Sequence, residues 1–215
     1  LPFYELVARY RVGWVAVSRG ERRRASELFE EVLDGARQRG HRSLESTCWN
    51  GLGEIARFDG RADRARRCYR RYRQLARELN RPESVALSYL NLAQVELTAQ
   101  RFDRAAANLE EASRRLDEVA RKAGYAHLIR LVRVVGSAGT GDAEAFRHHF
   151  APYAEGWPED ARLERDHAWL LEMAGDYASD RGDGGAANSA WRLGRTLWER
   201  LDDREAVERV TAKIG

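Results

Sequence analysis

Residues 49–69 read WNGLGEIARFDGRADRARRCY, and this stretch decides the fold. Forty residues later, residues 89–109 read YLNLAQVELTAQRFDRAAANL, with small and bulky residues at the same places. The loop Arg-x-Asp-Arg-Ala occurs in both copies, at residues 61–65 and 101–105. An earlier copy aligns Gly13 with Gly53 at the same offset. A fixed period of this length indicates a stacked array of repeats.

Each repeat has two halves that complement each other in size. Gly53 and Ala56 lie in the first half, and Ala65 and Tyr69 lie in the second. Two antiparallel helices approach closely where one presents Gly or Ala to a bulky residue of the other. Gly60 falls where a left-handed residue would end the first helix. The pattern therefore predicts helical hairpins, each closed by a small-to-aromatic contact.

These residues resemble the tetratricopeptide repeat signature. The pattern W-x2-L-G-x2-A over residues 49–56 and A-x3-Y over 65–69 matches it, with Ala where Tyr is usual. A later copy has L-x2-A-G-x2-A over 171–178 and A-x3-W over 187–191. The resemblance implies an all-α, right-handed superhelical solenoid of about five tetratricopeptide-like hairpins plus a C-terminal capping helix.

The predicted organisation is a single solenoid domain over residues 1–215. Its repeats are expected at about 6–40, 46–80, 86–121, 124–154 and 160–201, and the capping helix at 203–214. The fourth repeat is degenerate, and Gly156 with Pro158 interrupts the chain before the last one. We expect the chain to be a fragment of a longer polypeptide, because it opens on an uncapped apolar run: Leu1, Phe3, Tyr4, Leu6 and Val7.

Composition bounds the class of protein. The chain is 43% hydrophobic and 33% charged, with a mean hydropathy of −0.65, and no stretch is apolar enough to span a membrane. Its net charge of +3 does not by itself require nucleic acid. Two cysteines, Cys48 and Cys68, favour buried inert thiols and a cytoplasmic protein. The 37 basic residues include only two lysines, Lys122 and Lys213, which favours a GC-rich bacterial source.

The first helices of such an array line its concave side, so one face of each is predicted to form a partner-binding groove. The predicted groove residues are Tyr10, Trp14, Val17, Asn50, Glu54, Arg57, Leu90, Gln94, Leu97, Arg130, Glu172 and Asp176, with Ser179 beside them. This surface runs from aromatic to acidic and suits a peptide with apolar anchors and charge complementarity. The alternative is that Trp14, Leu90 and Leu97 pack against neighbouring helices. Tyr10 and Trp14 stand where chaperone-binding repeats carry Lys and Asn, which argues against that type of ligand.

A second candidate is a basic helix. Its arginines are Arg64, Arg66, Arg67, Arg70, Arg71, Arg73 and Arg77, and Arg22 to Arg24 begin an earlier helix. Nucleic acid would need these on one continuous face with stacking aromatics. The alternative is that they form ion pairs with acids of the preceding hairpin, namely Glu27, Glu30, Glu31 and Asp34.

Catalytic patterns are weak. His148 and His149 are adjacent and point about 100° apart on a helix, and no His-Glu-x-x-His motif accompanies them. The turn Gly139–Asp142 lacks the Lys-Ser/Thr of a phosphate loop. We therefore predict no catalytic residue, no metal and no cofactor.

The sequence thus predicts a protein-interaction module that binds a peptide or protein segment. It also resembles the C-terminal repeat regions of bacterial multidomain regulators, which implies the regulatory part of a signalling protein with a Ser/Thr kinase, a cyclase or an ATPase-coupled transcription regulator. Homodimerisation remains an alternative, and nucleic-acid binding through residues 64–77 is disfavoured.

Overall fold

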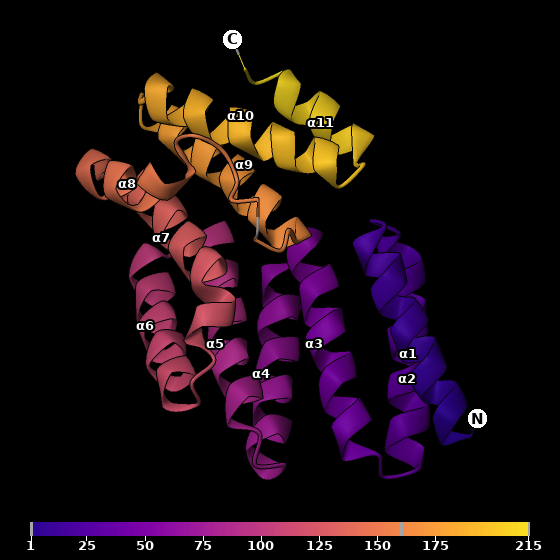
Figure 1. Cartoon of the computed structure of the whole chain (residues 1–215). Helices are drawn as coiled ribbons and strands as arrows, with labels where there is room; N and C mark the ends of the chain where they lie inside the picture. The colour runs from indigo at the N-terminus through magenta and orange to yellow at the C-terminus, as the bar shows by residue number, and fades with distance from the viewer. Residues whose placement is uncertain (1, 160, 215) are drawn as a thin grey trace. The chain divides into compact units, whose positions relative to one another are not determined.

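A computed structural model describes residues 2–159 and 161–214 (Figure 1). Leu1 of the apolar run and residue 160, the predicted start of the last repeat, lie outside them. The described part contains eleven α-helices: α1 (Phe3–Ser18), α2 (Arg22–Gln38), α3 (Arg42–Phe58), α4 (Ala62–Glu78), α5 (Pro82–Thr98), α6 (Phe102–Glu118), α7 (Ala126–Thr140), α8 (Ala143–Phe150), α9 (Arg165–Asp180), α10 (Gly184–Arg200) and α11 (Arg204–Thr211). The predicted all-α class is confirmed. Within the described ranges, no helix is both long and apolar enough to cross a membrane.

The chain divides into two compact units, residues 1–122 and residues 123–215. In the first unit, α1 and α2, α3 and α4, and α5 and α6 form three antiparallel hairpins. Each second helix also packs on the next first helix, α2 on α3 and α4 on α5, and the first helices α1, α3 and α5 contact one another in order. Sequential antiparallel pairing of this kind is the arrangement that the repeat predicts.

Identical turns connect these helices at intervals of twenty residues. The left-handed positions are Gly20, Gly40, Gly60, Asn80, Gln100 and Ala120. At Gly60, whose φ is 69°, the turn is a Schellman motif: the Gly60 N–H donates to the Arg57 carbonyl and the Arg61 N–H donates to the Ala56 carbonyl. The left-handed residue predicted at Gly60 is thereby confirmed.

Small residues hold the aromatic side chains between the helices. A Cβ added at Gly53 would lie 2.7 Å from the Tyr69 ring. The Phe29 ring is enclosed on two sides, since a Cβ at Gly13 or at Gly51 would lie 2.7 or 2.5 Å from it. The small-to-aromatic contacts expected from the sequence are therefore present, and Phe29 joins two successive hairpins.

The second unit departs from regular hairpin stacking. Helix α8 is only 8 residues long, and α7 packs directly against α9. The chain then crosses a short 3-10 helix, Ala151–Tyr153, and reaches α9 without further regular structure in the described residues. Stacked rings hold this connection: Tyr153 and Trp157 lie 5.5 Å apart at an interplanar angle of 4°. The repeat that the sequence marks as degenerate is thus the irregular part of this unit.

We expect Gly175→Ala to destabilise the second unit by about 1–3 kcal/mol, because the new methyl would overpack the helix contact. A Cβ at Gly175 would lie 2.3 Å from the Trp191 ring, which is fixed by its Nε1–H donating to Asp176 at 2.9 Å. Gly136 of α7 provides the matched control, since its Cβ would meet nothing within 4 Å. Gly136→Ala should stabilise the helix by about 0.5–1 kcal/mol. Urea denaturation followed by circular dichroism compares the two, and a stabilised Gly175→Ala variant would contradict the prediction.

Candidate protein-interaction surface

An aromatic platform lies on α1. Tyr10 and Trp14 are half-buried, and both rest on the buried Phe29 ring of α2, with ring centroids 5.9 and 5.4 Å away. Burial raises the pKa of the Tyr10 hydroxyl, and hydrogen bonds with Trp14 and Thr47 partly oppose the shift. Because Phe29 is held by two glycines, the two aromatic side chains above it are preorganised.

A pair of side-chain amides continues this surface onto α3 and α5. The Asn91 Nδ2 donates to the Asn50 Oδ1 at 2.9 Å, and both residues are half-buried. Glu54 is half-buried one turn beyond Asn50. We call Tyr10, Trp14, Asn50, Glu54 and Asn91 the first-helix row. Asn91 was missed by the sequence reasoning, because a 40-residue shift of Asn50 points to Leu90; the second Asn at nearly the same spacing was the available signal.

Other predicted groove residues are buried. They are Val17, Arg57, Leu90, Gln94 and Leu97. The Arg57 Nε lies 3.5 Å from the Tyr69 hydroxyl, inside its own hairpin. Leu90, Gln94 and Leu97 are fully buried. In this structure these five side chains are not accessible to a ligand, and we leave them out of the proposed surface. For Leu90 and Leu97 this agrees with the alternative interpretation of helix packing, whereas Trp14 retains an exposed part.

The acidic residues predicted in the second unit are engaged by its last helix. Glu172 is buried and receives hydrogen bonds from Arg209 at 2.8 and 2.9 Å and from Lys213 at 3.0 Å. Burial opposes ionisation, but these partners lower the pKa of Glu172. Asp176 accepts from Trp191 and from Lys213. The acidic groove end is therefore neutralised by α11 and the residues after it.

Arg130 and Ser179 complete the predicted set. Arg130 is half-buried on α7, and Ser179 is exposed on α9. Both belong to the second unit, and Ser179 lies about one turn beyond Asp176 on α9.

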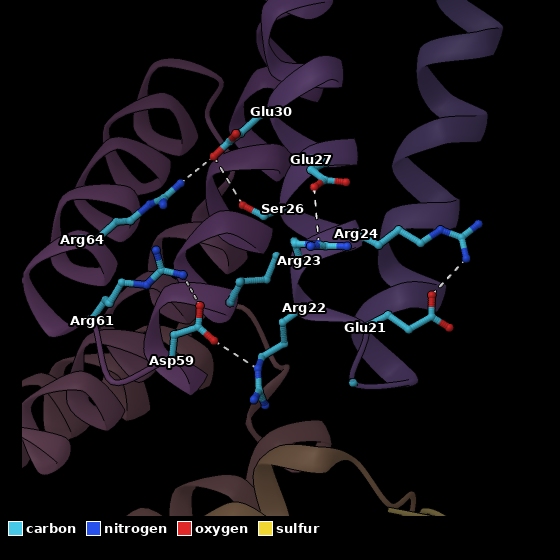
Figure 2. Close-up of a pocket in the computed structure, with 12 residues that line it drawn as sticks. Glu21, Arg22, Arg23, Arg24, Ser26, Glu27, Glu30, Asp59, Arg61 and Arg64 are labelled. Atoms are coloured by element: carbon cyan, nitrogen blue, oxygen red, sulfur yellow. Dashed lines mark hydrogen bonds and ion pairs between the residues drawn. The ribbon is translucent and has the colours of Figure 1, made fainter.

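The arginines around α2 and α4 are mostly paired with acids. A pocket of about 780 Å³ lies among these residues. Arg64 is 2.6 Å from Glu30 and Arg22 is 3.1 Å from Asp59, and Figure 2 shows both pairs. Arg23 lies 3.8 Å from Glu27. The Arg64–Glu30 contact agrees with the ion-pair alternative, whereas Glu27 pairs with an arginine of its own helix. Glu31, by contrast, pairs with Arg9 at 2.6 Å.

Further arginines of α4 point to separate internal partners. Arg66 binds the buried Glu96, and Arg71 lies 3.1 Å from Glu45. The Arg73 guanidinium lies 4.5 Å from the centre of the Tyr89 ring. Phosphate groups would compete with these contacts, so the arrangement does not favour the basic helix as a nucleic-acid site.

The two cysteines and the two adjacent histidines have surroundings that do not favour reactivity. Burial raises the pKa of the Cys48 thiol to about 12 and also raises that of Cys68. The His148 and His149 rings lie 5.1 Å apart. In the described ranges, no three His, Cys, Asp or Glu side chains are grouped so that they could hold a metal ion.

His167 is a buried histidine that should make stability depend on pH. Its Nδ1 accepts from the Glu164 N–H at 3.1 Å, its ring lies 4.7 Å from that of Trp157, and burial lowers its pKa to about 4. The unfolded chain has a histidine pKa of about 6.5, so His167 stabilises the fold fully above that pH. We expect a loss on the order of 3 kcal/mol as the pH falls from about 6.5 through 4.

The measurement is the free energy of unfolding between pH 7 and pH 4. His167→Gln keeps an acceptor for the Glu164 N–H and should show a shallower decline than the unaltered protein. His148→Gln, at an exposed position of α8, should not change the slope. Identical slopes for all three proteins would refute the assignment.

An all-α array of sequential hairpins with a polar and aromatic row on its first helices defines a helical-repeat protein. The family model of the tetratricopeptide repeat matches residues 44–118, so this part of the chain, α3 to α6, consists of tetratricopeptide repeats. Among solved structures, the chain is similar to BtubC (BKLC) from P. vanneervenii, with 17% sequence identity and a TM-score of 0.55. That similarity covers 89% of this chain and 78% of the other, and at this identity it shows a shared fold. No curated protein matches the sequence.

Proposed function

We propose that this protein is a protein-interaction module that binds a peptide or protein segment on the first-helix row. The observation that carries the proposal is the platform of Tyr10 and Trp14, half-exposed and held by the buried Phe29. Aromatic residues with a rigid support are typical of binding hot spots. Tetratricopeptide repeats generally bind proteins and are typically not catalytic.

The polar part of the first-helix row indicates which polar groups the ligand carries. Asn50 and Asn91 each retain hydrogen-bonding capacity beyond their mutual bond, since an amide side chain offers two donor hydrogens and an acceptor oxygen. Such groups suit the main chain of an extended segment. Glu54, beside them, favours a basic residue on the ligand. The ligand we infer therefore has an apolar anchor for Trp14 and a positive charge a few residues away.

The test is an affinity pull-down with the whole chain and with a Trp14→Ala, Glu54→Arg double variant. Asp34→Arg serves as the control, because it makes a comparable charge change at an exposed position of α2. Circular dichroism must first show that both variants remain helical. We expect the unaltered chain and the control to retain a protein that the double variant does not retain. Equal retention by all three baits would refute binding at the row.

We further propose that the module regulates a larger bacterial signalling protein. This step is supported by the resemblance of the repeats to those that follow kinase, cyclase and ATPase-coupled regulator domains. A partner identified in the pull-down as a component of such a pathway would support it. A partner that acts in an unrelated process would argue against it.

A further inference from the structure

A cluster of basic side chains lies across the α7–α8 hairpin. Arg130 and Arg133 are three residues apart and therefore lie on the same side of α7. Helix α8 follows after a short turn and packs against α7. Arg133 and His149 lie at similar distances along the chain before and after this turn, so the hairpin brings them together. The ring of His148 lies 5.1 Å from that of His149. We call Arg130, Arg133, His148 and His149 the α7–α8 cluster.

The electrostatics of His149 agree with this arrangement. Burial lowers the pKa of this histidine, and the charges of Arg133, His148 and Arg130 lower it further. Asp142, in the turn, acts in the opposite direction. Its carboxylate, however, already accepts a hydrogen bond of 2.9 Å from a backbone N–H at the start of α8. The His149 ring is therefore half-buried and neutral at pH 7, beside two permanently charged arginines.

The two arginines of the cluster differ from most arginines of α4. In the described ranges, neither Arg130 nor Arg133 has an ion pair with a carboxylate, whereas Arg66 of α4 is bound to Glu96. Like charges three residues apart on one helix repel each other and lower its stability. Cations that are kept together at this cost indicate an anionic ligand.

Other titratable and charged groups around α8 do not neutralise the cluster. Glu144 is exposed on α8, but five residues turn it by about 140° away from His149. Arg181, in the turn after α9, lies against the α7–α8 turn and adds a further positive charge. Tyr153, in the 3-10 helix that contacts α8, stays neutral because burial raises its pKa to about 12. Helix α10 also contacts α8, and its first charged residue is again an arginine, Arg192.

We propose that the α7–α8 cluster binds an acidic peptide segment of a partner protein. A guanidinium group binds a carboxylate through two parallel hydrogen bonds, and the cluster offers two such groups on one side of α7. The half-buried ring of His149 gains a proton when a carboxylate binds beside it, because the new negative charge favours the charged ring. The first-helix row lies in the other unit and is expected to take a basic residue, so the two sites are independent.

Other anionic ligands fit the cluster less well. Single-stranded nucleic acid needs exposed aromatic rings on which its bases stack, but Phe146, Phe150 and Tyr153 of this region are buried. A membrane surface needs apolar side chains beside the cations. Among the described residues, the large exposed apolar side chains all lie on α1. An acidic peptide needs neither feature, and its carboxylates match the basic side chains directly.

The probe is a fluorescein-labelled oligoglutamate peptide, titrated with the whole chain by fluorescence anisotropy at pH 7 and low salt. Arg133→Gln removes one charge from the cluster. Arg192→Gln is the matched control, because Arg192 is also exposed inside a helix and, over the described part of the chain, also lacks an ion pair with a carboxylate. We expect saturable binding that Arg133→Gln weakens by about fivefold or more and Arg192→Gln leaves unchanged. Circular dichroism of both variants should match that of the unaltered protein.

The pH dependence of binding tests the role of His149. NMR of the histidine rings measures the pKa of His149 with and without the peptide. A bound carboxylate favours the protonated ring, so this pKa should rise on binding, and the affinity should increase as the pH falls from 8 to 6. His149→Gln should remove much of this increase. At pH 8, where the ring is neutral, His149→Gln should bind the peptide nearly as well as the unaltered protein does.

Other outcomes would overturn the proposal. Absence of saturable binding, equal weakening by Arg133→Gln and Arg192→Gln, or an unchanged pKa of His149 would show that no acidic segment binds at the cluster. A single-stranded oligonucleotide that binds more tightly than the peptide and displaces it would assign the cluster to nucleic acid. The first-helix row is tested separately. The Trp14→Ala, Glu54→Arg variant should bind oligoglutamate normally, and its failure to do so would assign the peptide to the row instead.

Discussion

Replacing Glu96 with Ala is expected to lower the free energy of unfolding by about 3–5 kcal/mol, because it leaves a buried guanidinium without its carboxylate. Arg66 of α4 and Glu96 of α5 are joined by two hydrogen bonds of 2.7 and 3.2 Å. Their side chains are only 9% and 7% exposed. The remaining acid beside Arg66 is Asp63, which is largely in solvent and cannot replace Glu96.

Denaturant unfolding followed by circular dichroism measures the loss, with Glu27→Ala as control. Glu27 pairs with Arg23 at 3.8 Å, and both side chains are well exposed, so this change should have little effect. A double variant, Arg66→Met with Glu96→Leu, should recover most of the stability that Glu96→Ala loses, since it leaves no buried charge. A single variant as stable as the unaltered protein would contradict the assigned role of the pair.

Phe29→Ala is expected to cost a similar 3–5 kcal/mol, the usual range for removing a large buried ring. Phe29 is fully buried, fills the space between Gly13 of α1 and Gly51 of α3, and supports Tyr10 and Trp14. The substitution should therefore also weaken partner binding at the first-helix row, by releasing the two aromatic side chains above it.

A double-mutant cycle makes this prediction specific. On its own, Gly51→Ala should destabilise the protein, because its Cβ would lie 2.5 Å from the Phe29 ring. In the Phe29→Ala background the same methyl enters the vacated space, and Gly51→Ala should become neutral or stabilising. Such a change of sign is the signature of direct contact, whereas additive effects of the two substitutions would show that the residues do not share one site.

The fold could be predicted from sequence because its determinants are local and periodic. Gly53 with Tyr69 and Gly13 with Phe29 mark the helix pairs, and Gly60 marks the turn between them. Some turns show that packing sets the backbone even where glycine is absent. Gln100 and Ala120 both have a φ of 53°, in the left-handed region that side chains disfavour.

The candidate surface could be predicted only in part. Four of the predicted residues lie on it: Tyr10, Trp14, Asn50 and Glu54. The others were misplaced because the periodicity of a helix does not show how deeply a neighbouring helix buries each position. Leu90 and Asn91 show this most clearly: adjacent residues of α5, one is fully buried and the other is bonded to Asn50.

The repeat pattern also did not predict the ion pairs of Glu172. Glu172 is bound by Arg209 and Lys213, which lie 37 and 41 residues further along the chain. Arg209 and Lys213 lie beyond the last repeat, in the predicted capping helix, so the repeat pattern did not pair them with Glu172.

The twenty-residue interval between left-handed turns also limits which length changes the first unit tolerates. An insertion or deletion of two such intervals, forty residues, would leave every later helix in the same orientation. Its glycines would still lie against an aromatic ring. A change of one residue inside a helix would rotate everything beyond it by about 100° and bring charged positions into the interior. In this unit, insertions and deletions should therefore be tolerated in multiples of forty residues and rejected in ones and twos.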